Sequence, residues 1–489
     1  MLREQIPAGK DEQQSASPRP AVGQGARLLF SLWNMLLARR GLLAALPALA
    51  AVVLLFCGAS WQIFWIHTDA ARYQCYALAF WQGSQGIHLL PENQCAFLYQ
   101  FGVARSNVPP FHILPFEYPP LTLTLFSPAL VVPLIYYQIA FALLMALAVM
   151  LIYWLLQRYG PRGAGLACAF YLVVGAWATA EGRFDLVPAG LTLLCLIAAE
   201  HRRWSLAYIA LALAFLLKIY PLLLLPALFM AEQVAGGRFH RPSAPLTVRR
   251  LPGEIWQTLR GAGSWRWTHA LLFLGVAGTI SGLFALLNFQ GAVVSQLSYF
   301  ANRPVQVEAT GSTLLWLATL FGHPATVVYT FGSINIESDL GNLVALACEA
   351  CFLLGYVLVI LWQWRGKLDL VQAFIAVILV FIVTGKVFSP QYLIWLIPLL
   401  AYHGAFNRLW LLLWTPLSLL TTAVYPYLYM QARSATLAPY VPGFIEFVAI
   451  RNILLAVITL AFLFNWWNLK QRMAPAPADT SALPRPHPG

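Results

Sequence analysis

The chain has 489 residues, of which 60% are hydrophobic and only 10% are charged. Soluble proteins carry about 25% charged residues, so these charges are too few to cover a soluble surface of this size. This balance excludes a cytosolic enzyme, a disordered protein and a nucleic-acid binder that relies on a basic patch. The formal net charge of +12 is interpreted first as membrane topology, because positive residues gather in the cytoplasmic loops of membrane proteins.

The two ends of the chain differ from its middle. Residues 1–26 are polar and rich in Gln, Ser, Pro and Gly, and six basic residues lie within 1–40. The apolar run that begins near Gly41 is too long for the core of a cleaved signal peptide. We predict a disordered cytoplasmic tail over 1–40 and a second, proline-rich one over 469–489. Residues 41–468 between them are expected to form the transmembrane core.

Long apolar runs predict helices that cross a bilayer. About 20 apolar residues span the hydrocarbon core, and a helix satisfies its own backbone groups there. The weak alternation of apolar and polar residues argues against a membrane barrel. The run 120–131 is too short to cross and is expected to lie against the membrane or to re-enter it. About twelve spans are predicted, at 42–66, 132–156, 164–180, 186–199, 204–217, 220–232, 268–289, 341–363, 370–385, 391–404, 408–427 and 444–467.

Three long loops separate these spans, at 67–120, 233–267 and 290–340. With the N-terminus inside, 22 of the 30 basic residues fall on the inner side, including six arginines in the 233–267 loop. The positive-inside rule therefore predicts that both termini are inside and that the 67–120 and 290–340 loops are external. The expected fold is an all-α polytopic membrane protein.

Cysteines offer one candidate disulfide. Cys75 and Cys95 both fall in the first external loop, where a disulfide between them can form, but nothing in the sequence fixes the distance between them. Cys348 and Cys351 form a C-x-x-C inside an apolar span, where they are interpreted as small apolar residues.

Charges at the outer edge of spans are costly and usually functional. Asp69 follows the first span, and Tyr73 lies four residues later, so a helix would place both on one face. A carboxylate at this position suits a general base acting on a substrate at the membrane surface; the alternative is a helix cap. The basic residues on the outer side are Arg72, Arg105, Arg183, Lys218, Arg303, Lys386, Arg433 and Arg451.

Two further acidic residues lie on the outer side. Glu117 precedes Tyr118 and two prolines, which fix an extended entry into the next apolar run. Tyr118 fits an aromatic belt, which leaves Glu117 to be explained otherwise. Arg183 and Asp185 are two residues apart in the next outer link, and the simplest interpretation is that they pair with each other.

Three outer cations suggest a phosphate site. Lys218 interrupts a long apolar stretch, where it either extends its amine to the membrane surface or meets an anion. Arg303 lies in the second external loop and Lys386 in a later outer hairpin. Phosphate is the natural partner of such a set. These charges suit group transfer from a lipid phosphate, and they also suit a transporter.

An ordered series of motifs gives the chain a family resemblance. It resembles the polytopic glycosyltransferases of the GT-C fold, and most of all the polyprenyl-phosphate-mannose-dependent mannosyltransferases of glycosyltransferase family 87. The series covers about 69 to 400 and consists of Asp69 with Tyr73, Tyr118-Pro119-Pro120, Gly182 with Asp185, Lys218 with Pro221, Arg303 to Glu308 with Ser312, Phe331-Gly332-Ser333, and Phe388-Ser389-Pro390-Gln391-Tyr392.

The resemblance implies a mechanism on the extracytoplasmic side of the cell membrane. Asp69 is expected to be the catalytic base that deprotonates an acceptor glycan or glycolipid, which attacks the sugar of a polyprenyl-phosphate donor with inversion. Lys218, Arg303 and Lys386 are expected to bind the donor phosphate. The residues expected to bind substrate are Tyr73, Glu117, Tyr118, Asp185, Gln306, Glu308, Gln391 and Tyr392.

No metal and no cofactor are predicted. Many GT-C members carry two acidic residues spaced Asp-x-Asp or Glu-x-Asp in this loop, whereas here His67 stands two residues before Asp69. A transporter or flippase of lipid-linked sugars is the alternative function, and a polysaccharide polymerase or ligase is a third. The lack of an internal repeat and the large first external loop favour the enzyme. Mannose as the sugar rests on the resemblance alone.

Overall fold

The computed structural model describes residues 45–65, 68–91, 93–100, 107–239, 241 and 251–464. The two predicted tails lie outside these residues, as do His67, Arg105 and most of the basic segment after Phe239. Contacts divide the chain into a short unit, Met1–Pro47, of which only the helical residues 45–47 are described, and a main unit, Ala48–Gly489.

Within the described residues, six helices are long and apolar enough to cross a membrane. They confirm a multi-pass membrane protein that is mostly helical. The number of crossings and their direction stay predictions. The six are Ala45–Ile63, Leu134–Tyr159 with α6 (Tyr137–Tyr159), α12 (Thr268–Leu287), α15 (Gly341–Trp364), Arg408–Gln431 with α18 (Arg408–Thr422) and α19 (Tyr429–Gln431), and α20 (Phe444–Leu463).

Shorter apolar helices fill the space between these spans. Every predicted span contains a helix, and α9 (Trp204–Leu217) has the predicted bounds. Prolines explain several interruptions, because a proline starts a helical turn easily but cannot continue one. The shorter elements are Pro120–Val131 with α5 (Leu123–Phe126), α7 (Ala164–Gly175), α8 (Leu186–Glu200), α9, Tyr220–Ala235 with α10 (Leu225–Ala235), α16 (Leu370–Thr384) and α17 (Leu393–Gly404).

The helices α16 and α17 form the centre of the main unit. Side chains over 373–380 and 393–401 are buried, as expected for helices that are apolar on all sides. By contrast, α12 and α15 expose leucines such as Leu271, Leu286 and Leu354, at 60%, 85% and 72%. Exposed apolar faces on helices of spanning length are expected to contact lipid.

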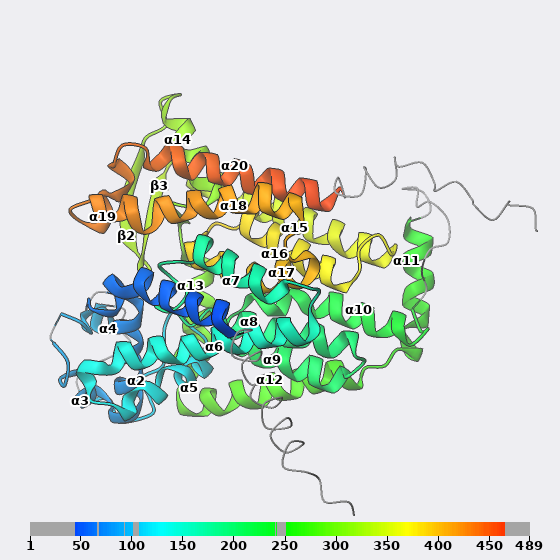
Figure 1. The fold of residues 1–489 in the computed structure, drawn as a ribbon, viewed down its shortest axis with the longest axis horizontal. Helices are drawn as coiled ribbons and strands as arrows, with labels where there is room; N and C mark the ends of the chain where they lie inside the picture. The colour runs from blue at the N-terminus through cyan, green and yellow to red at the C-terminus, as the bar shows by residue number, and fades with distance from the viewer. Residues whose placement is uncertain are drawn as a thin grey trace, which may run out of the picture. The chain divides into compact units, whose positions relative to one another are not determined.

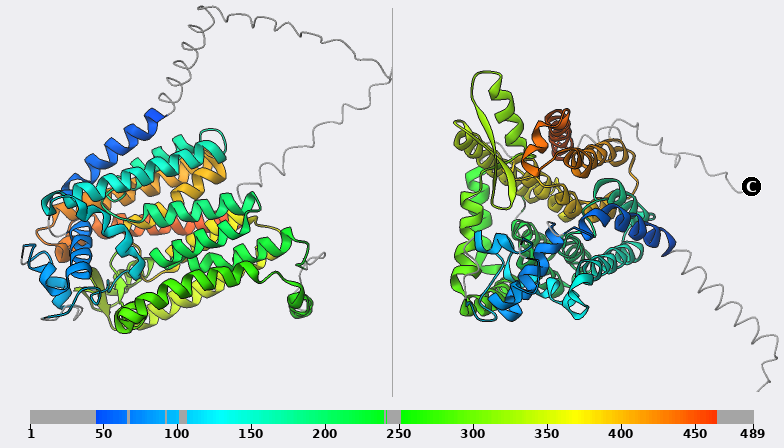
Figure 2. Two further views of the ribbon diagram at one scale, coloured as in Figure 1. Left: turned by 90° about the horizontal axis from the view of Figure 1, so that it is seen from below. Right: turned by 90° about the vertical axis from the view of Figure 1, so that its left-hand side faces the viewer.

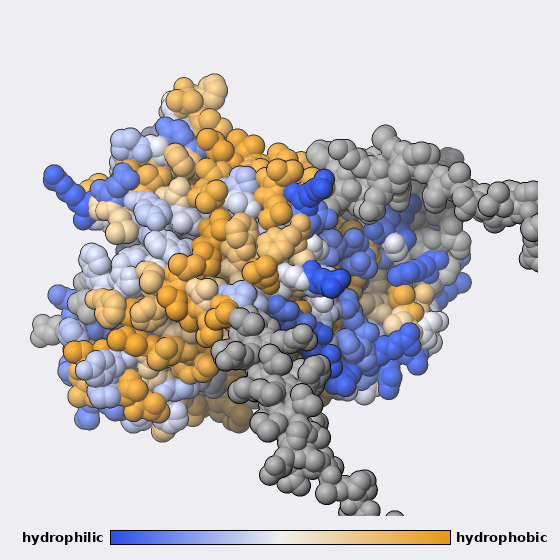
Figure 3. All heavy atoms as spheres, in the orientation of Figure 1, coloured by the Kyte–Doolittle hydropathy of each residue, from blue (hydrophilic) through white to orange (hydrophobic). Residues whose placement is uncertain are grey.

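The two ends of this helix bundle carry different elements. The helices α2 (Asp69–Gln82), α3 (Ser84–Ile87) and α4 (Ala96–Gln100) lie at one end with α19 and the strands, and α11 (Leu251–Arg260) lies at the other (Figure 1). Hydrophobic residues cover the middle of the face in Figure 3, and hydrophilic ones gather toward the α11 end. The helix α11 lies in the predicted cytoplasmic basic loop, so the opposite end corresponds to the predicted external loops.

A small antiparallel sheet corrects the all-α expectation. Strands β1 (Val305–Gln306), β2 (Ala325–Thr330) and β3 (Ser333–Ser338) pair in the order β1-β3-β2. Phe331 and Gly332 join β2 to β3 with φ of +51° and +67°, which is the conformation of a tight two-residue hairpin turn. The hairpin contacts α14 (Thr310–Thr319), which stands beside it in Figure 2, right. Just before β1, α13 (Ser295–Asn302) continues the chain from α12.

Candidate functional site

Asp69 is the first residue of α2, and Tyr73 follows one turn later in the same helix. The Thr68 hydroxyl donates to the Gln62 carbonyl oxygen at 3.0 Å, which ties the start of α2 to the end of the first apolar helix. The Asp69 carboxylate lies 2.7 Å from the Arg183 guanidinium and keeps 19% of its side-chain surface exposed. The carboxylate is therefore held in place by Arg183 and is still partly accessible from solvent.

The sequence interpretation that Arg183 pairs with Asp185 is wrong. Arg183 pairs with Asp69, and Asp185 accepts from the Lys218 ammonium at 3.0 Å. Asp185 stands directly before α8, in a helical turn, and residues two apart in such a turn do not face each other. The two charged residues of this link therefore pair with different elements: Arg183 with the start of α2, and Asp185 with the residue that follows α9.

Asp185 and Lys218 form the second ion pair of the cluster. The Trp395 indole donates to the same Asp185 oxygen at 2.7 Å, and Asp185 is 1% exposed. Lys218 follows the end of α9 in an extended conformation, which explains why this lysine interrupts the apolar stretch. Tyr392 stacks on Trp395 with ring centroids 3.9 Å apart, so it lies next to this pair.

Glu117 forms a third ion pair, with Arg72 one turn into α2. Their closest atoms are 2.5 Å apart, and the Glu117 side chain is 3% exposed. Burial raises the pKa of Glu117, and the Arg72 charge opposes this rise. The turn between β2 and β3 packs directly against this ion pair. A Cβ at Gly332 would overlap the Glu117 carboxylate and the Arg72 guanidinium. A glycine at this position therefore allows the β2–β3 turn to cover the Arg72–Glu117 pair.

Tyr73 lies behind Asp69 in an aromatic cluster. Its ring stacks on Phe126 at 4.3 Å between centroids and meets Tyr118 and Phe184 edge to face. Tyr73 is 1% exposed, whereas Tyr118 is partly exposed and lies 5.5 Å from the Lys218 ammonium. The two tyrosines predicted to bind substrate thus differ. Tyr73 is buried in the aromatic cluster behind Asp69, and Tyr118 borders the charged groups.

Arg303 and Lys386 occupy different surroundings. The Arg303 guanidinium donates to the Tyr299 hydroxyl at 3.0 Å, and its charge acts on Tyr392 together with those of Asp185 and Arg183. Lys386 instead donates to the Ala301 carbonyl oxygen at 3.2 Å and lies 3.9 Å from an exposed glutamate, Glu349. Arg303 therefore belongs electrostatically with the charged cluster, and Lys386 lies at its edge.

Two predicted glutamines keep free acceptor atoms. The Oε1 atoms of Gln306 and Gln391 are buried and have no partner among the residues that the structure describes. The Gln306 backbone N–H donates to the Lys386 carbonyl oxygen at 2.9 Å, which fixes β1 beside the segment before α17. Buried unpaired acceptors are costly, so both atoms can accept a hydrogen bond from a bound ligand.

Glu308 is fully engaged by the protein. The Arg451 guanidinium in α20 donates to its Oε2 at 2.7 Å and to its carbonyl oxygen at 2.5 Å, while the Tyr429 hydroxyl donates to Oε1 at 2.9 Å. Arg451 is 0% exposed and lies 4.1 Å from the ring centroid of Phe388. This fourth ion pair anchors the segment that carries Arg303 and Gln306 to the last span.

A disulfide joins Cys75 in α2 to Cys95, and their Cα atoms are 5.6 Å apart. The Gln94 amide donates to the Ala71 carbonyl oxygen at 3.2 Å and to Gln74 at 3.0 Å. These links fasten the following helix α4 to the helix that carries Asp69, and Phe97 of α4 packs on the Arg72 guanidinium at 4.4 Å.

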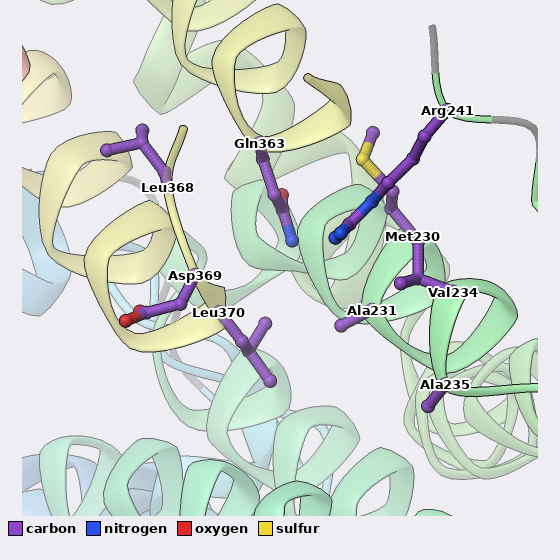
Figure 4. A pocket seen from close by; sticks show the side chains of 9 residues that line it. All are labelled: Met230, Ala231, Val234, Ala235, Arg241, Gln363, Leu368, Asp369 and Leu370. Carbon is purple, nitrogen blue, oxygen red and sulfur yellow. The ribbon is translucent and has the colours of Figure 1, made fainter. Parts of the chain in front are cut away.

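One pocket lies at the other end of the bundle, away from these charges. It lies between α10, the end of α15 and the start of α16 (Figure 4). Arg241 and Asp369 are its charged residues, and neither belongs to the ion pairs described above. The lining residues are Met230, Ala231, Val234, Ala235, Arg241, Gln363, Leu368, Asp369 and Leu370.

Sequence reasoning missed several residues of the cluster. Arg183, Trp395 and Arg451 hold three of the carboxylates, yet each lies far along the chain from its partner. Arg183 and Arg451 already stood among the outer cations, which was the one available signal. Within the described residues no three His, Cys, Asp or Glu side chains gather as a metal site would require.

The fold and this cluster define a helical multi-pass membrane protein with paired charges at one end of its spans. A family model described as Glycosyltransferase family 87 matches residues 116–390. The match covers more than half of the chain, which therefore belongs to glycosyltransferase family 87. Asp69 precedes the matched region and Arg451 follows it. No curated protein matches the chain.

Proposed function

We propose that this membrane glycosyltransferase moves a hexose, with mannose the first candidate, from a polyprenyl-phosphate donor to a glycan or glycolipid on the extracytoplasmic side. The observation that carries the proposal is the Asp69 carboxylate, 19% exposed, in a cluster that also holds Arg183, Lys218 and Arg303. A base and cations together are what transfer from a phosphate leaving group requires.

The reaction is a single displacement with inversion. The Asp69 carboxylate takes the proton of the acceptor hydroxyl while the acceptor oxygen bonds to C1 of the sugar. The bond between C1 and the phosphate oxygen breaks, and its electron pair leaves with the polyprenyl phosphate. The developing negative charge is stabilised by cations of the cluster, with Arg303 and Lys218 as the principal candidates. Lys386 at the edge is assigned to the outer approach of the lipid phosphate.

Two features support the extracytoplasmic side. The disulfide between Cys75 and Cys95 is of a kind that persists in oxidising compartments. The helix α2, whose first residue is Asp69, also lies at the end of the bundle opposite α11 (Figure 1), and α11 belongs to the arginine-rich loop that the positive-inside rule assigns to the cytoplasm. Membership of a glycosyltransferase family favours the enzyme over the transporter alternative.

The test is transfer by purified protein supplied with polyprenyl-phosphate mannose, glucose or arabinose and a synthetic octyl mannoside acceptor. We expect product with at least one donor, and a loss of at least about a hundredfold in Asp69→Asn. Asp339→Asn is the matched control, because Asp339 is 52% exposed and pairs with His323 in an outer loop. No product from any of the donors would overturn the donor class, and a fully active Asp69→Asn protein would remove Asp69 as the base.

A further inference from the structure

The link between α7 and α8 connects the proposed base to the lysine of the second ion pair. Arg183 holds Asp69 at 2.7 Å, and Asp185 holds Lys218 at 3.0 Å. Phe184 between them is 0% exposed and packs under the Lys218 ammonium, 4.6 Å from the ring centroid. Two carboxylates and two cations thus form two adjacent neutral ion pairs. One member of each pair comes from the three-residue segment 183–185.

The two pairs differ in how firmly they are held. Asp185 is 1% exposed and accepts from both Lys218 and Trp395, so removing its lysine would leave a buried charge, which is strongly unfavourable. Asp69 is 19% exposed and stands in the first turn of α2. Water and the positive end of the helix dipole would still stabilise Asp69 after Arg183 had left it.

The Arg183 guanidinium also has a hydrogen-bond donor that no described residue uses. Its Nε atom is buried and has no partner among the described residues, and the guanidinium lies 5.6 Å from the ring centroid of Tyr425. A guanidinium binds phosphate through two parallel hydrogen bonds. Of the cations in the two pairs, Arg183 is therefore the one that can turn to a new anion at low cost.

A glycosyl polyprenyl phosphate brings one negative charge to this site. The two pairs offer no net positive charge, and Arg303, which has no carboxylate partner within the described part of the chain, supplies the first attraction. Resting on the function proposed above, we propose that Arg183 exchanges partners when the donor binds: it leaves Asp69 for the donor phosphate, and only then is Asp69 free to accept the acceptor proton. The base thus becomes available when the leaving group is in place.

The exchange leads to ordered binding. In the resting protein the Asp69 carboxylate is occupied by Arg183, so an acceptor hydroxyl has no free base to meet. After the donor binds, the proton moves from the acceptor oxygen to Asp69, the C1–phosphate bond breaks, and Arg183 holds the phosphate that leaves. After release of polyprenyl phosphate, Asp69 gives its proton to water, and Arg183 returns to the carboxylate and restores the resting pair.

Binding of farnesyl phosphate, a short polyprenyl phosphate, tests this without any turnover. Asp69→Asn releases Arg183 from its carboxylate, so the variant should bind farnesyl phosphate about tenfold more tightly than the unaltered protein. The gain should vanish in the double variant Asp69→Asn/Arg183→Gln. Farnesol, which lacks the phosphate, should bind all of these proteins equally.

Arg303→Gln is the matched control. It should weaken farnesyl phosphate binding by the same factor with and without Asp69→Asn, because Arg303 does not depend on Asp69, whereas Arg183 does. Weaker or unchanged binding in Asp69→Asn would overturn the exchange, since a purely structural ion pair predicts one of those results. No farnesyl phosphate binding by any of the proteins would instead overturn the proposed donor class, so the two failures are distinguishable.

Discussion

The ion pair between Glu308 and Arg451 offers a sharp prediction about what holds the site together. Arg451→Met keeps most of the side-chain volume and removes the guanidinium. The Glu308 carboxylate, 2% exposed, would then retain only the hydrogen bond from the Tyr429 hydroxyl at 2.9 Å. Among the described residues, its backbone carbonyl oxygen would keep only the hydrogen bond from Asn452 at 3.2 Å.

The expected cost follows from the burial of both partners. Removing one member of a buried pair costs about 3–5 kcal/mol, because an uncompensated charge stays behind. The two hydrogen bonds that Arg451 donates to Glu308, at 2.7 and 2.5 Å, account for a loss of this order at about 1.5–3 kcal/mol for each charged bond. For a chain of this size we expect the midpoint of thermal unfolding to fall by roughly 5 °C.

The assay is thermal unfolding in detergent, followed by intrinsic tryptophan fluorescence. Adding Glu308→Gln to Arg451→Met should restore at least half of the lost stability, because the amide is neutral and still accepts from Tyr429. The exposed Arg433 provides the control variant Arg433→Met, which should unfold like the unaltered protein. An Arg451→Met protein of normal stability, or a double variant no more stable than the single one, would refute the reasoning.

Burial raises the pKa of Glu181, in the link outside the spans, from 4.5 to about 8. The folded protein keeps the proton in this range, whereas the unfolded chain loses it. The free energy of unfolding should therefore fall as the pH rises from 4.5 to 8, by about 3 kcal/mol at pH 7. Glu181→Gln should flatten this slope in melting curves. Gly332→Ala should lower transfer at least tenfold, because φ of +67° and the neighbouring ion pair both exclude a Cβ; normal activity would contradict this. Cys75→Ser should cost about 3 kcal/mol of stability and abolish the effect of a reductant on the melting curve. With Cys57 and Cys351 replaced, an impermeant maleimide added to intact cells should label Tyr329→Cys but spare Trp256→Cys, and the reverse would invert the predicted topology.

The helices could be predicted because their signal is local. A run of apolar residues of sufficient length is a helix in lipid whatever it packs against, so α9 matched its predicted bounds and α16 came within a residue of them. The β2–β3 hairpin was missed because its strands are short and partly polar. Its one local signal was Phe331-Gly332 between two segments rich in β-branched residues, which is typical of a two-residue turn.

The partners in the site could not be predicted, because each ion pair joins distant parts of the chain. Asp69 meets Arg183, and Glu308 meets a residue 143 positions later. The predicted topology already placed these charges together on one side of the membrane, but which carboxylate holds which cation depends on how the spans pack. The only local pairing inferred, between Arg183 and Asp185, failed for the same reason.

This pairing changes what the outer cations mean. Arg72, Arg183, Lys218 and Arg451 each hold a carboxylate from another part of the chain, so half of the eight cations predicted on the outer side, Lys218 of the suggested phosphate site among them, are neutralised within the protein. Besides Arg303, which donates to the Tyr299 hydroxyl and has no carboxylate partner among the described residues, a phosphate can gain a further cation only where an ion pair opens at low cost. The exposure of the carboxylate decides which pair that is. The Asp69 carboxylate is 19% exposed and stands at a helix N-terminus, whereas the Glu308 carboxylate is 2% exposed and lies outside any helix. Under the proposed mechanism, the same type of interaction therefore serves reactivity at Asp69 and stability at Glu308.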